Sequence, residues 1–207
     1  MDIKEEKEEL EIESHPWPPF IPEGAKVLIM GTFPPQSKRW NMDFYYPNRT
    51  NDFWKICGLL FCGNKDALLK EDGKNYDVNK IRELMADKHI ALNDTVRKAR
   101  RLKGNASDKF LDVVEPVPLF TLLSEMPECH TVVTTGEKAA GIIAELTNTE
   151  IPKMGEMVTA SIPARNGGDS GEIIEIWRMP STSRAYPLAV ERKAEYYGRM
   201  FRHLHIL

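Results

Sequence analysis

The chain has 207 residues, with 28 lysine and arginine residues against 31 aspartate and glutamate residues, a length typical of about one domain. Hydrophobic residues make up 42% and charged residues 29%, as expected for a globular chain that buries a sizeable core. No apolar run reaches the roughly 18–20 residues of a membrane span, and the acidic start lacks the apolar core of a secretory signal. The three cysteines form no CxxC pair and are too few for a four-thiolate metal site. We therefore expect core thiols, no metal, no membrane contact and a cytoplasmic location.

The net charge of −3 is unevenly distributed along the chain. Residues 1–13 hold seven acidic residues and two lysines, which sum to −5, so the remainder sums to +2. This pattern predicts an acidic, flexible tail over residues 1–14 and a single domain over residues 15–207. The mildly basic body is compatible with nucleic acid, although the net charge of the whole chain would disfavour it.

The first elements in the chain are an extended segment, a buried strand and two helices. Four prolines within residues 16–22 exclude a helix there. The apolar run at 25–31 predicts a short buried strand. Apolar residues at helical spacing predict helices over about 51–60 and over 78–88.

The rest of the chain continues to alternate strands and helices. We expect a strand at 89–92, a basic helix at 96–103, a helix at 119–124, a strand at 131–135, a helix at 137–146, a strand at 172–179 and an amphipathic helix from 190 to 204. Residues 147–171 show the weakest pattern, and we expect loops there. The alternation predicts an α/β fold, a three-layer αβα sandwich whose central sheet has four to five mainly parallel strands.

Three loops leave the carboxyl ends of expected strands, at residues 31–51, 92–95 and 180–186. All three are rich in serine, threonine, asparagine, aspartate or aromatic residues. Because ligands bind beyond the carboxyl ends of strands in parallel sheets, we expect these loops to form one shared site.

Motifs in these loops resemble the uracil-DNA glycosylase superfamily, most closely its mismatch-specific uracil and hypoxanthine-DNA glycosylase branches. Gly31-Thr32-Phe33-Pro34-Pro35 is similar to a Gly-x-x-Pro-Gly turn, and residues 44–56 are similar to an aromatic stretch that ends in Pro-x-Asn-x-Phe-Trp. Residues 92–94, 134–140 and 179–186 match later segments in the same order. The resemblance spans essentially the whole body of the chain.

The chain departs from the family pattern at four points, the first of which is Pro35 in place of the second glycine of the turn. Phe33 stands where the main uracil enzymes have a water-handling Asp and the mismatch-specific branch has Asn. Resemblance to the hypoxanthine-type branch assigns that role to Asn51, and an insertion after Pro47 leaves Asn48 as the alternative. The late loop begins with Met179-Pro180 instead of His-Pro, so no histidine can donate to the leaving base from there.

The resemblance implies a monomeric, monofunctional DNA glycosylase of base-excision repair, without a metal or cofactor. It flips a deaminated base, uracil or hypoxanthine, out of DNA and hydrolyses its N-glycosidic bond. Asn51 orients the water or binds the base, and Asp94 acts as base or electrostatic stabiliser. The expected base-binding residues are Gly31, Thr32, Phe33, Pro34, Tyr46 and Asn93. The expected DNA-binding residues are Ser181, Thr182, Ser183, Arg184, Tyr186, Arg97 and Arg101, with Arg184 or Tyr186 as the wedge that fills the gap left by the base.

Most of these residues also have a purely structural interpretation. Asn51 can cap the helix that follows it, and Asn93 or Asp94 can cap the expected basic helix. Phe33 can pack in the core, and residues 181–183 can form a plain polar turn. The alternative function is a repurposed member of the fold that binds nucleic acid or a nucleobase without excision. A third possibility, an unrelated α/β nucleotide-binding enzyme, is disfavoured because the chain has neither a P-loop nor a GxGxxG motif.

We predict that deleting residues 1–13 tightens DNA binding at low salt, because an acidic segment competes with phosphates for the basic body. A salt titration of the affinity of the full and shortened chains measures this effect. Equal affinity at every salt concentration would refute it.

Overall fold

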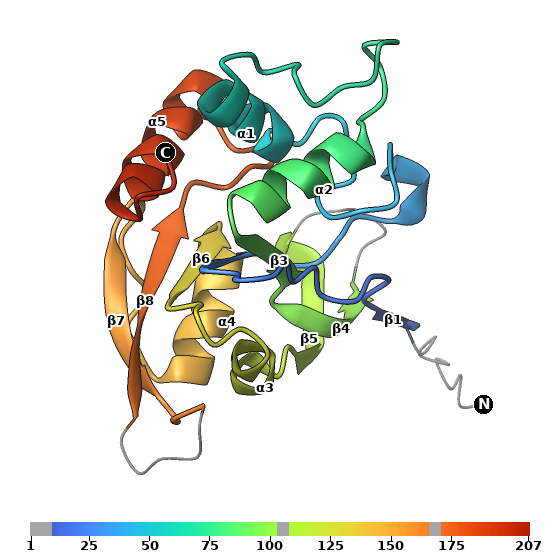
Figure 1. Cartoon of the computed structure of the whole chain (residues 1–207). Helices are drawn as coiled ribbons and strands as arrows, with labels where there is room; N and C mark the ends of the chain where they lie inside the picture. Colours follow the sequence, from blue (N-terminus) through green and yellow to red (C-terminus); the bar gives the residue numbers. More distant parts are fainter. Residues whose placement is uncertain (1–9, 103–107, 166–170) are drawn as a thin grey trace, which may run out of the picture.

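A five-stranded sheet forms the centre of the computed structural model, which describes residues 10–102, 108–165 and 171–207 (Figure 1). The strand order is β3-β2-β6-β8-β7. The strands are β2 (Val27–Gly31), β3 (Ile90–Asp94), β6 (Thr131–Thr135), β7 (Met157–Ile162) and β8 (Glu172–Met179). Only the edge strand β7 pairs antiparallel, so the sheet is mainly parallel, as predicted.

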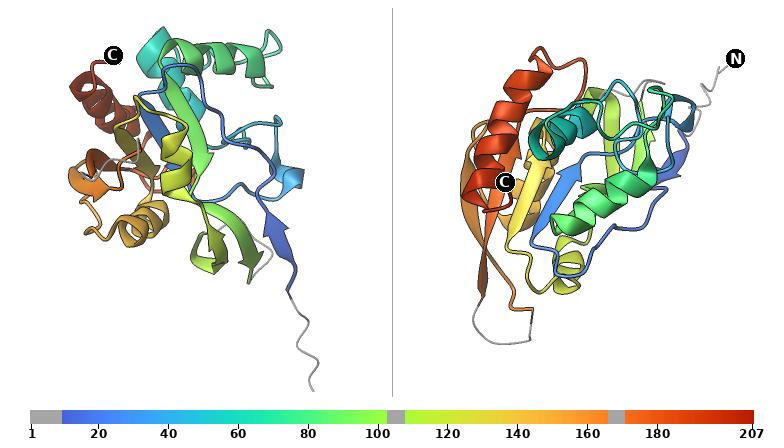
Figure 2. Two further views of the ribbon diagram at one scale, coloured as in Figure 1. Left: turned by 60° about the horizontal axis from the view of Figure 1, so that its bottom comes forward. Right: turned by 45° about the horizontal axis from the view of Figure 1, so that its top comes forward.

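Helices cover both faces of this sheet, which gives the expected three layers. One face carries α1 (Phe53–Cys62), α2 (Val78–Asp87) and α5 (Val190–His203), which lie in front of the strands in the right panel of Figure 2. The other face carries α3 (Leu119–Ser124) and α4 (Glu137–Thr147). Alternate strand residues face the two layers: Ile29 packs with the first set of helices, and Leu28 packs with the second.

Apart from the helix expected at 96–103, the structure confirms the expected strands and helices within a few residues of their predicted ends. Two short 3₁₀ helices, η1 (Ser37–Arg39) and η2 (Asp108–Phe110), lie in the connections. No helix within the described residues is long and apolar enough to cross a membrane.

A second, three-stranded sheet corrects the prediction of a basic helix at 96–103. Its strands, in the order β1-β4-β5, are β1 (Ile12–Ser14), β4 (Val96–Arg101) and β5 (Leu111–Pro116). The basic run favours a helix locally, but β4 pairs antiparallel with a strand on each side. Val96 and Ala99 are three positions apart, a spacing that also suits one face of a helix. In β4 an irregularity in the register with β5 between these two residues lets both pack against Leu111. Lys103, the last residue of the expected helix, lies outside the described residues.

The end of the acidic tail and the weakly patterned segment at 147–171 also differ from the prediction. Residues 1–9 of the acidic tail lie outside the described residues. Its last residues, Ile12–Ser14, belong to β1, where Glu13 forms an ion pair with Arg101 at 2.7 Å. A deletion that tests the tail alone therefore stops before residue 10. Residues 147–171, where we expected loops, contain β7. Its local sequence pattern is weak, and it forms a strand through antiparallel pairing with β8.

A buried lysine joins the start of α1 to the loop after β8, which we call the late loop (residues 180–186). The Lys193 side chain in α5 is 0% exposed, and its ammonium donates to Asp52 Oδ2 at 2.8 Å and to the Ser183 carbonyl at 2.9 Å. The Asp52 amide in turn donates to the Thr182 carbonyl at 2.8 Å. These bonds hold two of the expected site loops against each other.

We predict that Asp52→Asn lowers the free energy of unfolding by about 3 kcal/mol, because it leaves the buried Lys193 charge without its carboxylate. Urea denaturation measures the change. The matched control is Asp66→Asn, which removes the exposed Arg49–Asp66 pair and should cost at most about 0.5 kcal/mol. Equal losses in the two variants would contradict this role of the buried pair.

Candidate functional site

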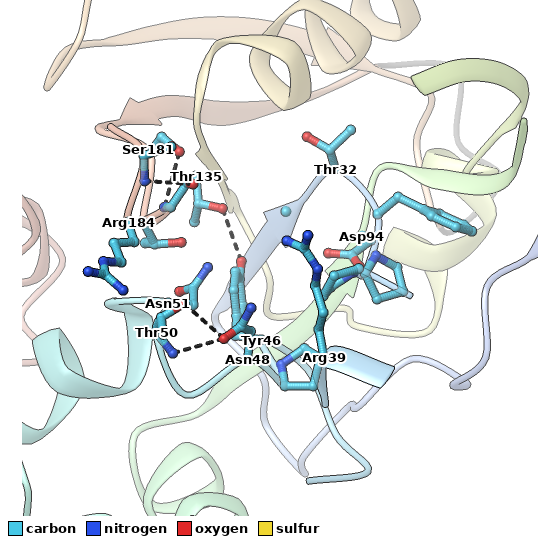
Figure 3. Close-up of a pocket in the computed structure, with 18 residues that line it drawn as sticks. Thr32, Arg39, Tyr46, Asn48, Thr50, Asn51, Asp94, Thr135, Ser181 and Arg184 are labelled. Carbon is cyan, nitrogen blue, oxygen red and sulfur yellow. Dashed lines mark hydrogen bonds between the residues drawn. The ribbon is translucent and has the colours of Figure 1, made fainter. Parts of the chain in front are cut away.

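A cavity of about 470 Å³ lies at the carboxyl ends of β2, β3 and β6, beside the late loop (Figure 3). Most residues that we predicted for the site line it: Gly31, Thr32, Phe33, Pro34, Tyr46, Asn51, Asp94, Ser181, Thr182, Ser183 and Arg184. The structure adds Pro35, Arg39, Pro47, Asn48, Thr50, Thr135 and Ala185. The three loops that leave the strand ends thus do meet at one cavity, as the parallel sheet predicted.

Asn51 both starts a helix and borders the cavity. Its Oδ1 accepts the Phe53 amide hydrogen at 2.9 Å, so the capping interpretation is confirmed. Because the oxygen serves the first turn of α1, the amide N–H groups are the donors that Asn51 offers to the cavity. Figure 3 shows Asn51 and Asp94 on opposite sides of Tyr46.

Asn48, the alternative to Asn51, borders the same cavity but closes a local turn. Its Oδ1 accepts from both the backbone amide and the hydroxyl of Thr50, each at 2.9 Å. Both asparagines therefore remain candidates for the water-handling role, and each uses its oxygen within the fold.

Asp94 is the last residue of β3 and is 7% exposed. It lies directly across the parallel ladder from Gly31, and a Cβ at position 31 would come within 2.6 Å of Asp94 Oδ1. A residue with no side chain is therefore required at position 31. Neither Asn93 nor Asp94 caps a helix, because β3 continues through Thr95 into β4.

His15 is the functional candidate that sequence reasoning missed. Its Nε2 lies 3.0 Å from Asp94 Oδ2, and its Nδ1 lies 2.9 Å from the Trp17 carbonyl. Burial by itself lowers the pKa of His15, but the hydrogen bond and the negative charge of Asp94 outweigh it, so the pKa lies above its ordinary value of 6.5. No local pattern announces this contact, because the two residues lie 79 positions apart.

Tyr46 forms a wall of the cavity between Asn51 and Asp94 (Figure 3). Its ring stacks on Phe53 with centroids 4.0 Å apart, and its hydroxyl lies 3.2 Å from Thr135 Oγ1. Burial, reinforced by the charge of Asp94, raises the pKa of the Tyr46 phenol well above its ordinary value. The hydroxyl therefore stays protonated and neutral at physiological pH.

Phe33 borders the cavity, but its ring packs with the small sheet, in the cluster of Val96, Ala99 and Leu111. This agrees with the interpretation of Phe33 as core packing. Arg101, which we expected at phosphates, places its guanidinium 5.5 Å from the Phe33 ring centroid and donates to the Pro34 carbonyl at 2.7 Å. Its side chain is only 8% exposed in these contacts and supports the turn at 31–35.

Three other predicted residues lie away from the cavity. Asn93 accepts a hydrogen bond from the Tyr45 hydroxyl at 3.0 Å and faces a second cavity. Tyr186 faces a neighbouring cavity, where its hydroxyl contacts the Met154 sulfur at 3.0 Å. Arg97 is exposed and pairs with Glu115.

Positive charge lies at the rim of the cavity, where Arg39 and Arg184 are both exposed. Two hydrogen bonds from the backbone to serine side chains stabilise the late loop. Ser181 Oγ accepts from the Ser183 amide, and Ser183 Oγ accepts from the Ala185 amide. Within the described parts of the chain, no cluster of three or more His, Cys, Asp or Glu residues is arranged to hold a metal ion.

The chain is similar in sequence and in structure to proteins named as DNA glycosylases. The chain is 30% identical over 125 residues to a protein named hypoxanthine DNA glycosylase from Methanosarcina barkeri, an alignment that covers 59% of this chain and 71% of the relative. A solution NMR structure of a candidate uracil DNA glycosylase from Methanosarcina acetivorans matches with a TM-score of 0.62 and 20% identity, covering 94% of this chain and 99% of that one. No family model matches the chain.

We predict that Gly31→Ala displaces Asp94 and lowers the free energy of unfolding by about 1–3 kcal/mol, because the added Cβ overlaps Oδ1. Gly141→Ala is the matched control, since a Cβ there lies 3.6 Å from Ile151 Cδ1 and fits within α4. The control should be neutral or stabilising by up to about 1 kcal/mol. Thermal or urea unfolding compares the two, and equal stability of both variants would count against the close approach.

Proposed function

Because the chain belongs to the uracil-DNA glycosylase superfamily, we propose that it is a DNA glycosylase that excises a deaminated base, hypoxanthine or uracil. The observation that supports this most directly is the shared cavity, which brings the Asn51 amide, the Asp94 carboxylate and the late loop to one edge of a parallel sheet. Its volume of about 470 Å³ falls within the range of small-molecule sites, and a base flipped from the duplex is of that size class.

The reaction breaks the C1′–N bond of the nucleotide while a water oxygen bonds to C1′. Positive charge builds on the sugar and negative charge builds on the departing base (by analogy with glycoside hydrolysis). In this proposal the Asp94 carboxylate stabilises the sugar and accepts the proton of the attacking water. The Asn51 N–H groups orient that water or donate to the base as it acquires charge.

The rim residues supply the contacts that hold the nucleic acid. Arg39 and Arg184 place positive charge on opposite sides of the mouth, where it attracts phosphates. Ser181 and Ser183 supply hydroxyls on the late loop, and Arg184 remains the candidate wedge. Arg101 and Tyr186 are less available, since their polar groups are used within the fold.

One observation favours the alternative of a member of the fold that binds nucleic acid or a base without excising it. Phe33 stands at the position of the family's water-handling residue, and the oxygens of both Asn48 and Asn51 serve local turns. The two functions share the cavity and differ in chemistry, so an excision assay separates them.

The test uses labelled duplex and single-stranded oligonucleotides that carry one uracil, hypoxanthine or xanthine, with alkali cleavage at abasic sites. Asn51→Asp is the sharpest variant, because it keeps an oxygen for the Phe53 amide but has no N–H donor. We predict that it lowers the excision rate by about 10²–10³-fold with a smaller loss of stability. Asn79→Ala, at an exposed position in α2, is the control and should match the wild type.

Each outcome assigns the chemistry. Excision by the wild type and its loss in Asn51→Asp support the enzyme and its key residue. Excision retained in Asn51→Asp keeps the enzyme and transfers the role to Asn48 or Asp94. DNA binding without excision of any base would establish the repurposed binder.

A further inference from the structure

A histidine from the N-terminal segment (residues 15–22) reaches the carboxylate at the centre of the candidate site. His15 Nε2 lies 3.0 Å from Asp94 Oδ2, and the side chains of His15 and Asp94 are 7% and 9% exposed. The pair also lies between two cavities. Asp94 lines the cavity of the candidate site, which we call the base cavity, and both residues line a second cavity of about 400 Å³. The late loop, which follows Met179, has no histidine of its own.

We propose that His15 is a positioning residue for the excision reaction, holding one oxygen of Asp94 so that the other faces the base cavity. This inference rests on the proposed function and assigns it a residue that acts through Asp94 instead of touching the substrate.

The two oxygens of Asp94 lie in different surroundings. Oδ2 contacts the His15 ring, whereas Oδ1 lies over Gly31, at the end of β2 that opens into the cavity. Rotation of the carboxylate would exchange these contacts. The histidine bond opposes that rotation, so it fixes which oxygen meets the sugar and the water.

The imidazole ring is held from every side. Its Nδ1 lies 2.9 Å from the Trp17 carbonyl, and its plane stacks on Tyr45 with centroids 5.6 Å apart. The edges of Trp17 and Phe33 pack against it at 5.7 and 5.8 Å. Because the position of the ring is fixed, its hydrogen bond also restricts the orientation of the Asp94 carboxylate.

His15 Nε2 faces Asp94 Oδ2, while Nδ1 lies 2.9 Å from the Trp17 carbonyl oxygen and 3.3 Å from the Trp17 amide nitrogen. The doubly protonated imidazolium donates to both oxygens. A neutral ring with its proton on Nε2 keeps the bond to Asp94 and accepts from the Trp17 amide through Nδ1, but it lacks the positive charge that strengthens its bond to the carboxylate. The titratable and charged groups around the ring are Asp94, the Tyr45 phenol, and Arg97 and Glu125, which line the second cavity. Asp94 makes the direct contact, and its charge outweighs burial in setting the raised pKa of His15.

The polypeptide around His15 is anchored without the ring. The His15 amide donates to the Arg97 carbonyl at 2.8 Å, and β1 pairs with β4 just before it. Beyond it, Phe20 and Leu92 exchange two backbone hydrogen bonds at 2.9 and 3.0 Å. A variant without the imidazole therefore keeps the segment in place, which makes the role testable.

The test compares wild type, His15→Gln and the control His205→Gln, which changes an exposed histidine near the C-terminus. Single-turnover excision rates are measured from about pH 5 to about pH 9, which brackets the usual titration of histidine. We expect the wild-type rate to fall as the pH rises through a His15 pKa above 6.5, since the ring then loses the positive charge that strengthens its hydrogen bond to Asp94. His15→Gln should lose this limb and run about 10- to 100-fold slower at neutral pH, with DNA affinity nearly unchanged. His205→Gln should follow the wild type.

A second measurement does not depend on activity. The His15 ring is titrated by NMR in the wild type and in Asp94→Asn, which removes the charge but keeps an oxygen near Nε2. We expect the pKa of His15 to fall in Asp94→Asn, because burial then acts with no charge to oppose it. An unchanged His15 pKa would overturn the coupling between the two residues.

The outcomes separate this inference from the function beneath it. If the wild type excises no base, the proposed function fails and the positioning role fails with it. If the wild type excises and His15→Gln shows the same rate and pH profile, the positioning role alone is overturned. A slower His15→Gln variant with the alkaline limb removed supports both.

Discussion

The parallel register of the central strands is the constraint on which the candidate site depends. Because β2, β3 and β6 run in the same direction, their carboxyl ends bring Gly31, Asp94 and Thr135 to one edge of the sheet. The register also sets Gly31 directly beside Asp94, and only a residue without a side chain tolerates that contact. A shift of one residue would turn the carboxylate to the opposite face of the sheet, away from the cavity.

The other half of the site depends on a buried ion pair. Lys193 reaches from α5 to Asp52 and to the late loop, so the start of α1 and the late loop are fixed to each other. A buried ammonium is costly unless its charge and donors are satisfied, and here a carboxylate and a carbonyl satisfy them. Asn51, next to Asp52, inherits its position beside the cavity from this pairing.

The N-terminal region supports the site from behind the turn at 31–35. Glu13 holds Arg101, whose guanidinium donates to the Pro34 carbonyl, while the Trp40 indole donates to the carbonyl of Pro35. His15 adds the contact to Asp94. Residues 13–15 therefore contact both Arg101, which supports the backbone of the turn, and the carboxylate beside that turn.

The sequence by itself determined the elements with clear periodicity, the α/β layers and the meeting of three loops at the strand ends, because these follow from local apolar spacing and the geometry of parallel sheets. Tertiary structure alone decided that the basic run at 96–101 is a strand, since its partners at 12–14 and 111–116 override its helical tendency. It also decided the His15–Asp94 contact, because the sequence pattern reports neighbours within a few residues and this pair is joined only by the fold.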